Sequence, residues 1–286
     1  ALSPNVLKRD YIILWSSLIL ILLIFMLGVL GIWKFDPVPL AGVITIIITL
    51  IALSYFVLIF IFGKLNIDEK RKMLLIFILF IGAAFFWSGF DQGGSSFNIF
   101  AKEYTNRIIL GWEYPASWLQ IVNPAFVVIL SPIMAYIWIF LGKKMLDPSL
   151  PFKFGLGLIL MGVGFIIIAM GASTAINDES LASAKWLLLT YLFHTIGELV
   201  ISPIGLAAIS SLSPKRFIGQ MMGVWFLASS LGAIIAGLLS GKATAGGLQS
   251  MPDLFNNIAI GSTLVGLLLI MLAKPIHNWV FKEENE

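Results

Sequence analysis

Apolar stretches recur along this 286-residue sequence, each about 20 residues long and therefore able to cross a hydrocarbon core of about 30 Å as an α-helix. Hydrophobic residues make up 59% of the chain and charged residues only 12%. The mean hydropathy of +0.99 excludes an ordinary soluble domain. The strands of a membrane barrel would be shorter and would alternate in polarity. The sequence therefore predicts an all-α membrane protein.

Eight spanning segments are expected. The first two contain no acidic or basic residue and are apolar all round, so they are expected to face lipid as an inserted transmembrane hairpin within residues 1–67. The other six are richer in Gly, Pro, Asn and Gln, which is typical of helices packed around a polar interior, and they form a predicted second domain, residues 68–286. The expected spans are residues 11–32, 38–62, 73–100, 116–141, 153–172, 184–211, 217–240 and 254–273.

The basic residues predict the orientation of these spans. If the N-terminus is cytoplasmic, 13 of the 18 lysines and arginines lie on the cytoplasmic side, which indicates a multi-pass protein with both ends inside. These are Lys8, Arg9, Lys64, Lys70, Arg71, Lys72, Lys143, Lys144, Lys153, Lys215, Arg216, Lys274 and Lys282. The net charge of +3 then requires no nucleic-acid partner, and the absence of cysteine excludes disulfides.

Glu198 lies near the middle of an expected span, where a carboxylate costs roughly 2.5 kcal/mol or more. His194 precedes it by one turn, on the same helix face, and Pro203 frees the carbonyl of Leu199 and is a candidate helix hinge. Glu198 could bind an ammonium group, pair with a basic residue or take up a proton. A purely structural ion pair is the alternative, and His194 could be either a proton carrier or a hydrogen-bonded interhelical residue.

Asp91 is the second acidic residue within a predicted span. Small and polar residues surround it, and Gly93 and Gly94 could allow close helix packing or a hinge. A pairing across a packed interface is as consistent with this pattern as a functional role.

The fourth segment contains Asn123 and two prolines, Pro124 and Pro132, which are candidate hinges. A broken helix is tolerated in a membrane where protein or a water-filled cavity satisfies its backbone, so this segment predicts a substrate pathway, with kinks for packing as the alternative. In the seventh segment, Trp225 and Ser229 lie one turn apart on a face of small residues.

Enzymatic and metal-binding interpretations are disfavoured. An intramembrane aspartyl protease needs two aspartates that share a proton, and Asp91 is alone in the spans. His194 and Glu198 could supply two metal ligands, but a third of suitable type is missing, so no metal site is expected.

Four motifs in order, "FFWSGFDQGGSSFNIFA", "SWLQIVNPAFVVILSP", "YLFHTIGELVISPIGLAAISSLSP" and "MMGVWFLASSLGA", resemble the C-terminal half of the proton-dependent oligopeptide transporter family. The resemblance covers residues 68–275 and implies the C-terminal six-helix bundle of the major facilitator fold. The preceding segments resemble the helix pair that prokaryotic members insert between their two bundles.

The resemblance implies roles for individual residues. The position of Glu198 faces the amino terminus of the peptide, that of Asn123 helps orient this terminus, and those of Trp225 and Ser229 line the pocket. Asp91 falls where the family carries a gating acid, more often Glu, that pairs with a residue of the N-terminal bundle. Its shorter side chain is a departure from that pattern.

The resemblance implies proton-coupled symport of di- and tripeptides by alternating access, with protons as coupling ion and no other cofactor. Its expected partners are a peptide substrate, the lipid bilayer and an N-terminal six-helix bundle that this sequence lacks, and its expected location is the bacterial inner membrane. One alternative is a related transporter for another small solute, such as nitrate or an amino-acid derivative. Another is a non-transporting membrane assembly protein.

Overall fold

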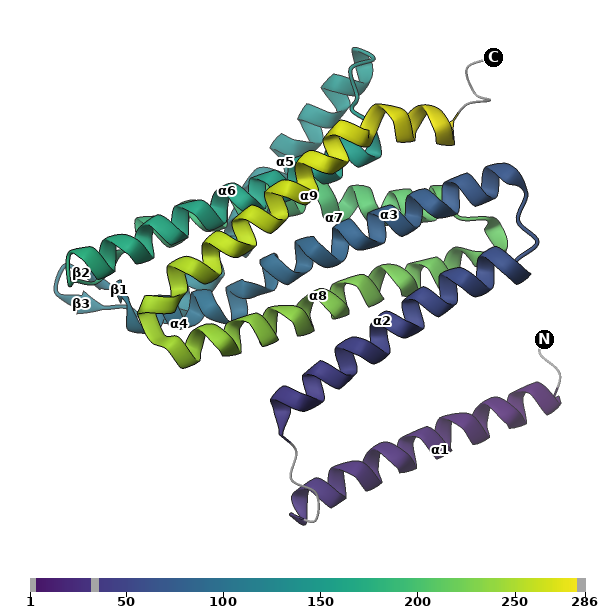
Figure 1. Ribbon diagram of the computed structural model, residues 1–286, viewed down its shortest axis with the longest axis horizontal. Helices are drawn as coiled ribbons and strands as arrows, with labels where there is room; N and C mark the ends of the chain where they lie inside the picture. Colours follow the sequence, from purple (N-terminus) through teal and green to yellow (C-terminus); the bar gives the residue numbers. More distant parts are fainter. Residues whose placement is uncertain (1–3, 32–35, 282–286) are drawn as a thin grey trace. The chain divides into compact units, whose positions relative to one another are not determined.

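The computed structural model describes residues 4–31 and 36–281, and almost all of this part of the chain is helical (Figure 1). In the described ranges, seven helical segments are long and apolar enough to cross a membrane, and the first predicted span falls on a helix with a shorter apolar stretch, Leu14–Val29. The α-helices are α1 (Pro4–Val29), α2 (Pro37–Phe62), α3 (Ile67–Phe90), α4 (Ser96–Glu103), α5 (Val122–Lys143), α6 (Leu150–Asn177), α7 (Lys185–Leu212), α8 (Ile218–Gly246) and α9 (Met251–Val280).

The chain divides into two compact units within α2, at Ile44 and Thr45, whereas the sequence predicts a domain boundary near residue 68, which stays a prediction. The second unit includes most of α2, because one face of this helix packs on the bundle. Phe56 is buried there and meets the ring of Phe77 of α3 edge-on, with 4.9 Å between centroids. A helix that is apolar all round carries no polar face to distinguish protein contact from lipid contact. The first unit, Ala1–Ile44, contains α1 and the start of α2.

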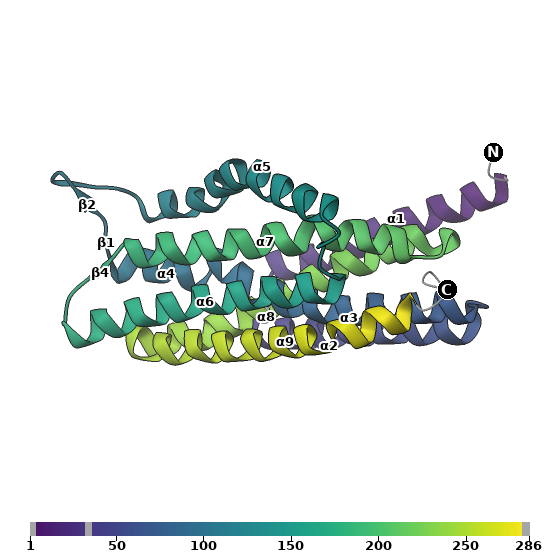
Figure 2. The same cartoon turned by 90° about the horizontal axis from the view of Figure 1, so that it is seen from above.

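Small residues bring the central helices of the second unit into close contact. Helix α6 runs between α7 and α9 (Figure 2), and its Gly155 lies so near α9 that an added Cβ would come within 2.5 Å of the Gly266 carbonyl oxygen. On the side toward α7, a Cβ at Gly157 would lie 3.1 Å from the Gly197 carbonyl oxygen. Such close backbone approach is how membrane helices gain dispersion energy where no hydrophobic effect drives them together.

The third predicted span is broken and is not one continuous helix. Helix α3 ends at Phe90, a 3-10 turn (η1, Asp91–Gly94) follows, and α4 completes the crossing. The buried Gln92 stabilises this break, since its amide donates to the Ala236 carbonyl of α8 at 3.1 Å and its carbonyl accepts from Ser96 at 2.6 Å. Asp91 therefore lies at the end of a helix.

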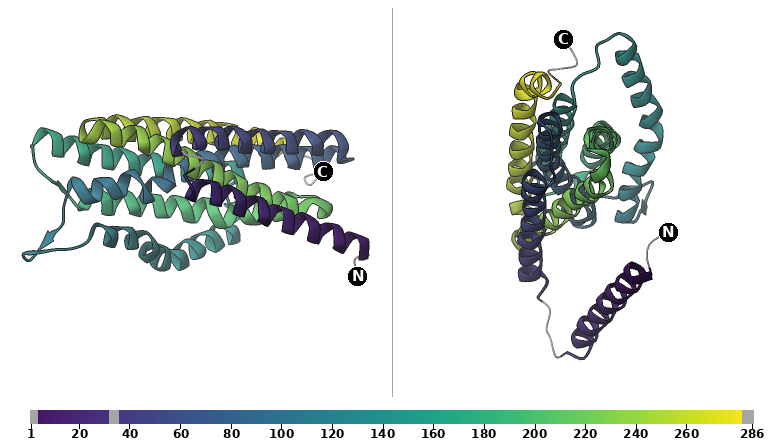
Figure 3. Two further views of the ribbon diagram at one scale, coloured as in Figure 1. Left: turned by 90° about the horizontal axis from the view of Figure 1, so that it is seen from below. Right: turned by 90° about the vertical axis from the view of Figure 1, so that its right-hand side faces the viewer.

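Short strands connect the helices at the end of the bundle to which α4 leads. Strand β1 (Thr105–Asn106) pairs in parallel with β4 (Ala182–Ser183), and β2 (Ile108–Ile109) forms a hairpin with β3 (Trp112–Glu113). A 3-10 helix, η2 (Ala116–Ile121), then leads into α5, which lies along one side of the bundle against α7 (Figure 3). No residue of α5 is buried.

At the opposite end, the connection between α2 and α3 is held in place. Asn66 caps α3 by accepting a hydrogen bond from the Glu69 backbone at 2.7 Å, and the Glu69 carboxylate accepts one from the Asn66 backbone at 3.1 Å. Arg216, just before α8, donates to the same carboxylate at 2.8 Å and to the carbonyl of Gly63 at 3.2 Å.

Candidate functional site

Two cavities lie along α5 and α7, and together they collect eight of the predicted site residues. The first, the Asp91 cavity, has a volume of about 210 Å³, and its predicted lining residues are Asp91, Gly93, Gly94, Asn123, Pro124 and His194. The second, the Glu198 cavity, has a volume of about 550 Å³ and includes Glu198 and Pro203. Residues from α3, η1, α5 and α7 thus meet around two half-buried carboxylates.

Asn123 connects the two cavities. Its amide nitrogen donates to the Glu198 carboxylate at 3.2 Å and to the Thr195 hydroxyl at 2.9 Å, and it lines the Asp91 cavity as well. The Thr195 hydroxyl in turn donates to the Tyr191 carbonyl at 2.7 Å, which fixes its lone pairs toward Asn123. One oxygen of Glu198 is therefore oriented by a neutral donor, and the carboxylate keeps capacity to accept from a ligand.

Neither Asp91 nor Glu198 forms an ion pair with a basic side chain in the described part of the chain. A pair of intramembrane acids without a resident counter-ion can hold a cationic group, a proton, or a basic residue from another part of the protein. No group of three or more potential metal ligands is present among the described residues.

The three prolines differ in their effect on the helices. Pro124 occupies the first turn of α5, where a missing N–H leaves no hydrogen bond unmade, so the helix is not interrupted there; its hinge role stays a prediction. Pro132 lies inside α5, which is visibly bowed in Figure 2. Pro203 lies inside α7, which stays continuous, and both Pro203 and Leu199, whose carbonyl it frees, line the Glu198 cavity. The hinge roles of Pro132, Pro203, Gly93 and Gly94 stay predictions.

His194 is placed in the helix core with only 2% of its surface exposed. Its Nε2 lies 3.2 Å from the Met161 carbonyl of α6, and its ring packs on Phe165 at 4.9 Å and Phe97 at 5.5 Å between centroids. A Cβ at Gly164 would come within 2.4 Å of the ring. This arrangement matches the hydrogen-bonded interhelical histidine, and a proton-linked role stays a prediction.

Trp225 and Ser229 lie apart from these two cavities within the described residues. Trp225 is 4% exposed, fills the space over Gly205 of α7 and meets Phe154 of α6 edge-on at 6.3 Å between centroids. The Ser229 hydroxyl donates to the Phe226 carbonyl of its own helix at 2.9 Å. Trp225 therefore packs three helices together in this structure, and its predicted contact with substrate is untested.

Sequence reasoning missed several residues of the site. Tyr191 and Thr195 precede Glu198 by seven and three positions, so their helical spacing placed them on its face. Trp138, on α5, lines the Glu198 cavity, and its Nε1 is buried without a hydrogen-bond partner. No short-range signal marks Trp138, because its place depends on how α5 lies against α7.

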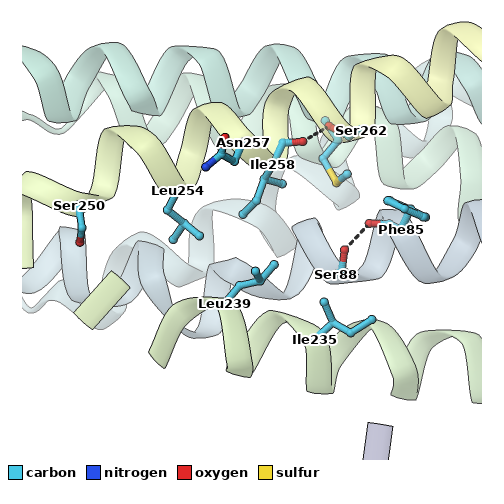
Figure 4. A pocket seen from close by; sticks show the side chains of 11 residues that line it. Phe85, Ser88, Ile235, Leu239, Ser250, Leu254, Asn257, Ile258 and Ser262 are labelled. Atoms are coloured by element: carbon cyan, nitrogen blue, oxygen red, sulfur yellow. Dashed lines mark hydrogen bonds between the residues drawn. The ribbon is translucent and has the colours of Figure 1, made fainter. Parts of the chain in front are cut away.

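A third cavity, of about 430 Å³, lies between α3, α8 and α9 (Figure 4). Its polar side chains are largely satisfied by their own helices: Ser88 donates to the Phe85 carbonyl at 2.8 Å, and Ser262 donates to the Ile258 carbonyl at 2.7 Å. None of its lining residues is acidic or basic. This cavity lacks the charge needed to hold an ionic ligand, so the candidate site is the pair of cavities beside Asn123.

Comparison with known proteins identifies relatives over nearly all of the chain. The sequence is 36% identical over 267 residues to the peptide transporter YePEPT of Yersinia enterocolitica, covering 92% of this chain and 52% of that protein. It is 33% identical to the di-/tripeptide transporter of Lactococcus lactis, covering 94% and 54%. A crystal structure of a peptide transporter POT in complex with sulfate superposes with a TM-score of 0.85 at 28% identity, covering 97% of this chain and 55% of that one.

These relatives confirm the expected architecture, a helical membrane bundle of the major facilitator type, and this chain spans about half of their length. The family profile described as PTR2, POT family, matches residues 33–250. The resemblance noted in the motifs is thereby confirmed. The chain is part of a multi-pass membrane protein and belongs to the POT family.

Proposed function

We propose that this chain supplies the C-terminal half of a proton-coupled di- and tripeptide symporter. The observation that carries the proposal is the Glu198 carboxylate, oriented by Asn123 at 3.2 Å and free of any described basic partner. A peptide presents an ammonium group at its amino terminus whatever its side chains are. A carboxylate that recognises this group binds many different peptides.

The coupling to protons is assigned to the two acids. Glu198 binds the peptide ammonium when it is ionised, and a proton on Glu198 removes that attraction. Asp91, in the neighbouring cavity, acts as a gate whose pairing with the second half forms and breaks as it exchanges a proton. Because Asn123 contacts Glu198 and lines the Asp91 cavity, it connects the two events. Protons are the coupling ion, and no other cofactor is involved.

The partner of this half is an N-terminal six-helix bundle, and the two halves alternate in access around a midplane site. The exposure of α5 supports this assignment. It carries Asn123 and Trp138 beside the candidate site, yet none of its residues is buried and it packs mainly on α7. A helix that lines a substrate pathway needs a second wall, and the N-terminal bundle would provide it. We propose that the protein lies in the bacterial inner membrane with both ends of this chain cytoplasmic.

The test is uptake of labelled dialanine by the intact transporter in proteoliposomes, with Glu198→Gln against the parent. The variant keeps the size of the side chain and the Asn123 contact but cannot ionise. We expect loss of gradient-driven uptake without loss of folded protein, whereas Glu179→Gln, at an exposed position after α6, keeps uptake unchanged. Uptake at the parent rate by the Glu198 variant would refute its role. A parent that binds no dialanine would favour a transporter for another small solute.

A further inference from the structure

A crevice between α2, α3 and α9 combines basic and apolar side chains at one end of the bundle. The α2–α3 connection and the end of α9 lie at this end (Figure 1), and the crevice has a volume of about 330 Å³. We call it the basic crevice. Its lining residues are Phe60, Ile67, Lys70, Arg71, Leu74 and Trp279.

Positive charge dominates the basic crevice. Its lining contains Lys70 and Arg71 and no acid. The Arg71 guanidinium lies 5.9 Å from the ring centroid of Trp279, which holds it above the apolar wall. Asp68, one turn earlier on α3, contacts Arg71 at 3.6 Å, and 47% of the Asp68 side chain is exposed. Such pairs are weak, so Arg71 is available to a stronger anionic partner.

The walls of the basic crevice are apolar and accessible. Ile67 is 68% exposed and Trp279 is 44% exposed, and both lie within helical segments long and apolar enough to cross a membrane. Tryptophan is enriched where a helix meets the headgroup layer, and lysine and arginine extend from that depth toward phosphate. The crevice therefore presents cations at headgroup depth and apolar surface below them.

We propose that the basic crevice binds an anionic phospholipid. Lys70 and Arg71 bind the headgroup phosphate and are attracted by the net negative charge of the headgroup. An acyl chain lies against Leu74 and Phe60. A zwitterionic lipid offers the same chain but no net charge, so the two cations select against it. The cavity of Figure 4 is larger but has no ionisable lining residue, so it provides no such selection.

A lipid in this position would contact three helices at once. Phe60 belongs to α2, Lys70 and Arg71 to α3, and Trp279 to α9. The bound lipid would thus bridge α2, α3 and α9. This role is independent of peptide transport and applies whether or not the proposed substrate is correct.

Native mass spectrometry of the intact protein, released from nanodiscs, tests the proposal. The nanodiscs contain equal amounts of phosphatidylglycerol and phosphatidylcholine with the same acyl chains. We expect the parent to retain phosphatidylglycerol preferentially. The double variant Lys70→Gln/Arg71→Gln should lose affinity for it by about 30-fold, since each basic contact at the membrane surface contributes roughly fivefold.

The matched control is Lys143→Gln/Lys144→Gln, a neighbouring basic pair at the end of α5, outside the basic crevice. It removes the same charge, so its retention of phosphatidylglycerol should equal that of the parent. An equal loss of phosphatidylglycerol in both double variants would indicate a general attraction of this lipid to basic helix ends and would overturn the proposed site. Equal retention of the two lipids by the parent would also overturn it. If the Lys70/Arg71 double variant does not fold, the single variants should each show about a fivefold loss.

Discussion

Gly266 of α9 allows a quantitative test of how the bundle is packed. A Cβ at this position would lie 2.7 Å from the Gly155 carbonyl oxygen and 2.9 Å from Cγ1 of Ile159, both on α6. Ordinary contact begins at 3.4 Å, so α6 and α9 would have to separate by about 0.7 Å. The obstructing atom is backbone and cannot rotate away. Overpacking of this kind costs roughly 1–3 kcal/mol.

Gly261 on the same helix is the matched control, because a Cβ there would meet no atom within 4 Å. Replacing a helical glycine by alanine gains about 1 kcal/mol where space allows. Because this gain is common to both positions, we expect Gly266→Ala to be about 1–3 kcal/mol less stable than Gly261→Ala. The free energy of unfolding is measured by titrating dodecyl sulfate into maltoside micelles and following helicity by circular dichroism. Equal stability of the two variants would refute the close contact of α6 and α9.

Three further variants test other parts of the structure. Asp91→Asn should abolish gradient-driven uptake of dialanine while sparing exchange between unlabelled and labelled peptide; loss of both would place Asp91 in substrate binding. Trp225→Ala should destabilise the bundle by about 3–5 kcal/mol, because removal of the buried ring leaves a cavity over Gly205. The same unfolding titration measures this loss. Arg216→Gln should cost no more than about 1 kcal/mol of stability, since its pair with Glu69 is half exposed. Limited proteolysis between α2 and α3 should nevertheless become faster, and unchanged cleavage would contradict the role of Arg216 in holding this connection.

The helical membrane fold was predictable because the cost of an unsatisfied backbone in lipid leaves few alternatives to long apolar helices. The break after Phe90 was not predictable in the same way. Gly93 and Gly94 permit it, but the buried hydrogen bond from Gln92 to Ala236 joins residues far apart in the sequence. The same holds for the division of the chain within α2, which depends on where Phe56 packs.

The candidate site was predictable where its side chains are polar, because a polar group within an apolar span costs free energy in lipid. Glu198, Asp91 and Asn123 are polar groups in apolar spans, and the structure brings all three to adjoining cavities. Trp225 offered no such signal, because an aromatic ring suits both a packed interface and a ligand pocket. Thr195 was missed since a lone threonine in a helix usually bonds to its own backbone, as this one also does.

The position of Asn123 suggests how one conformational change can depend on both ligands. It is the only predicted site residue in contact with both cavities in the described part of the chain, through Glu198 on one side and the Asp91 cavity on the other. It also lies at the start of α5, which packs on α7 without a buried residue of its own. Under the proposed function, a helix held so lightly would shift when a peptide ammonium competes for Glu198, and that shift would change the lining of the Asp91 cavity. The events at Glu198 and at the Asp91 cavity would then be coupled through the Asn123 side chain alone.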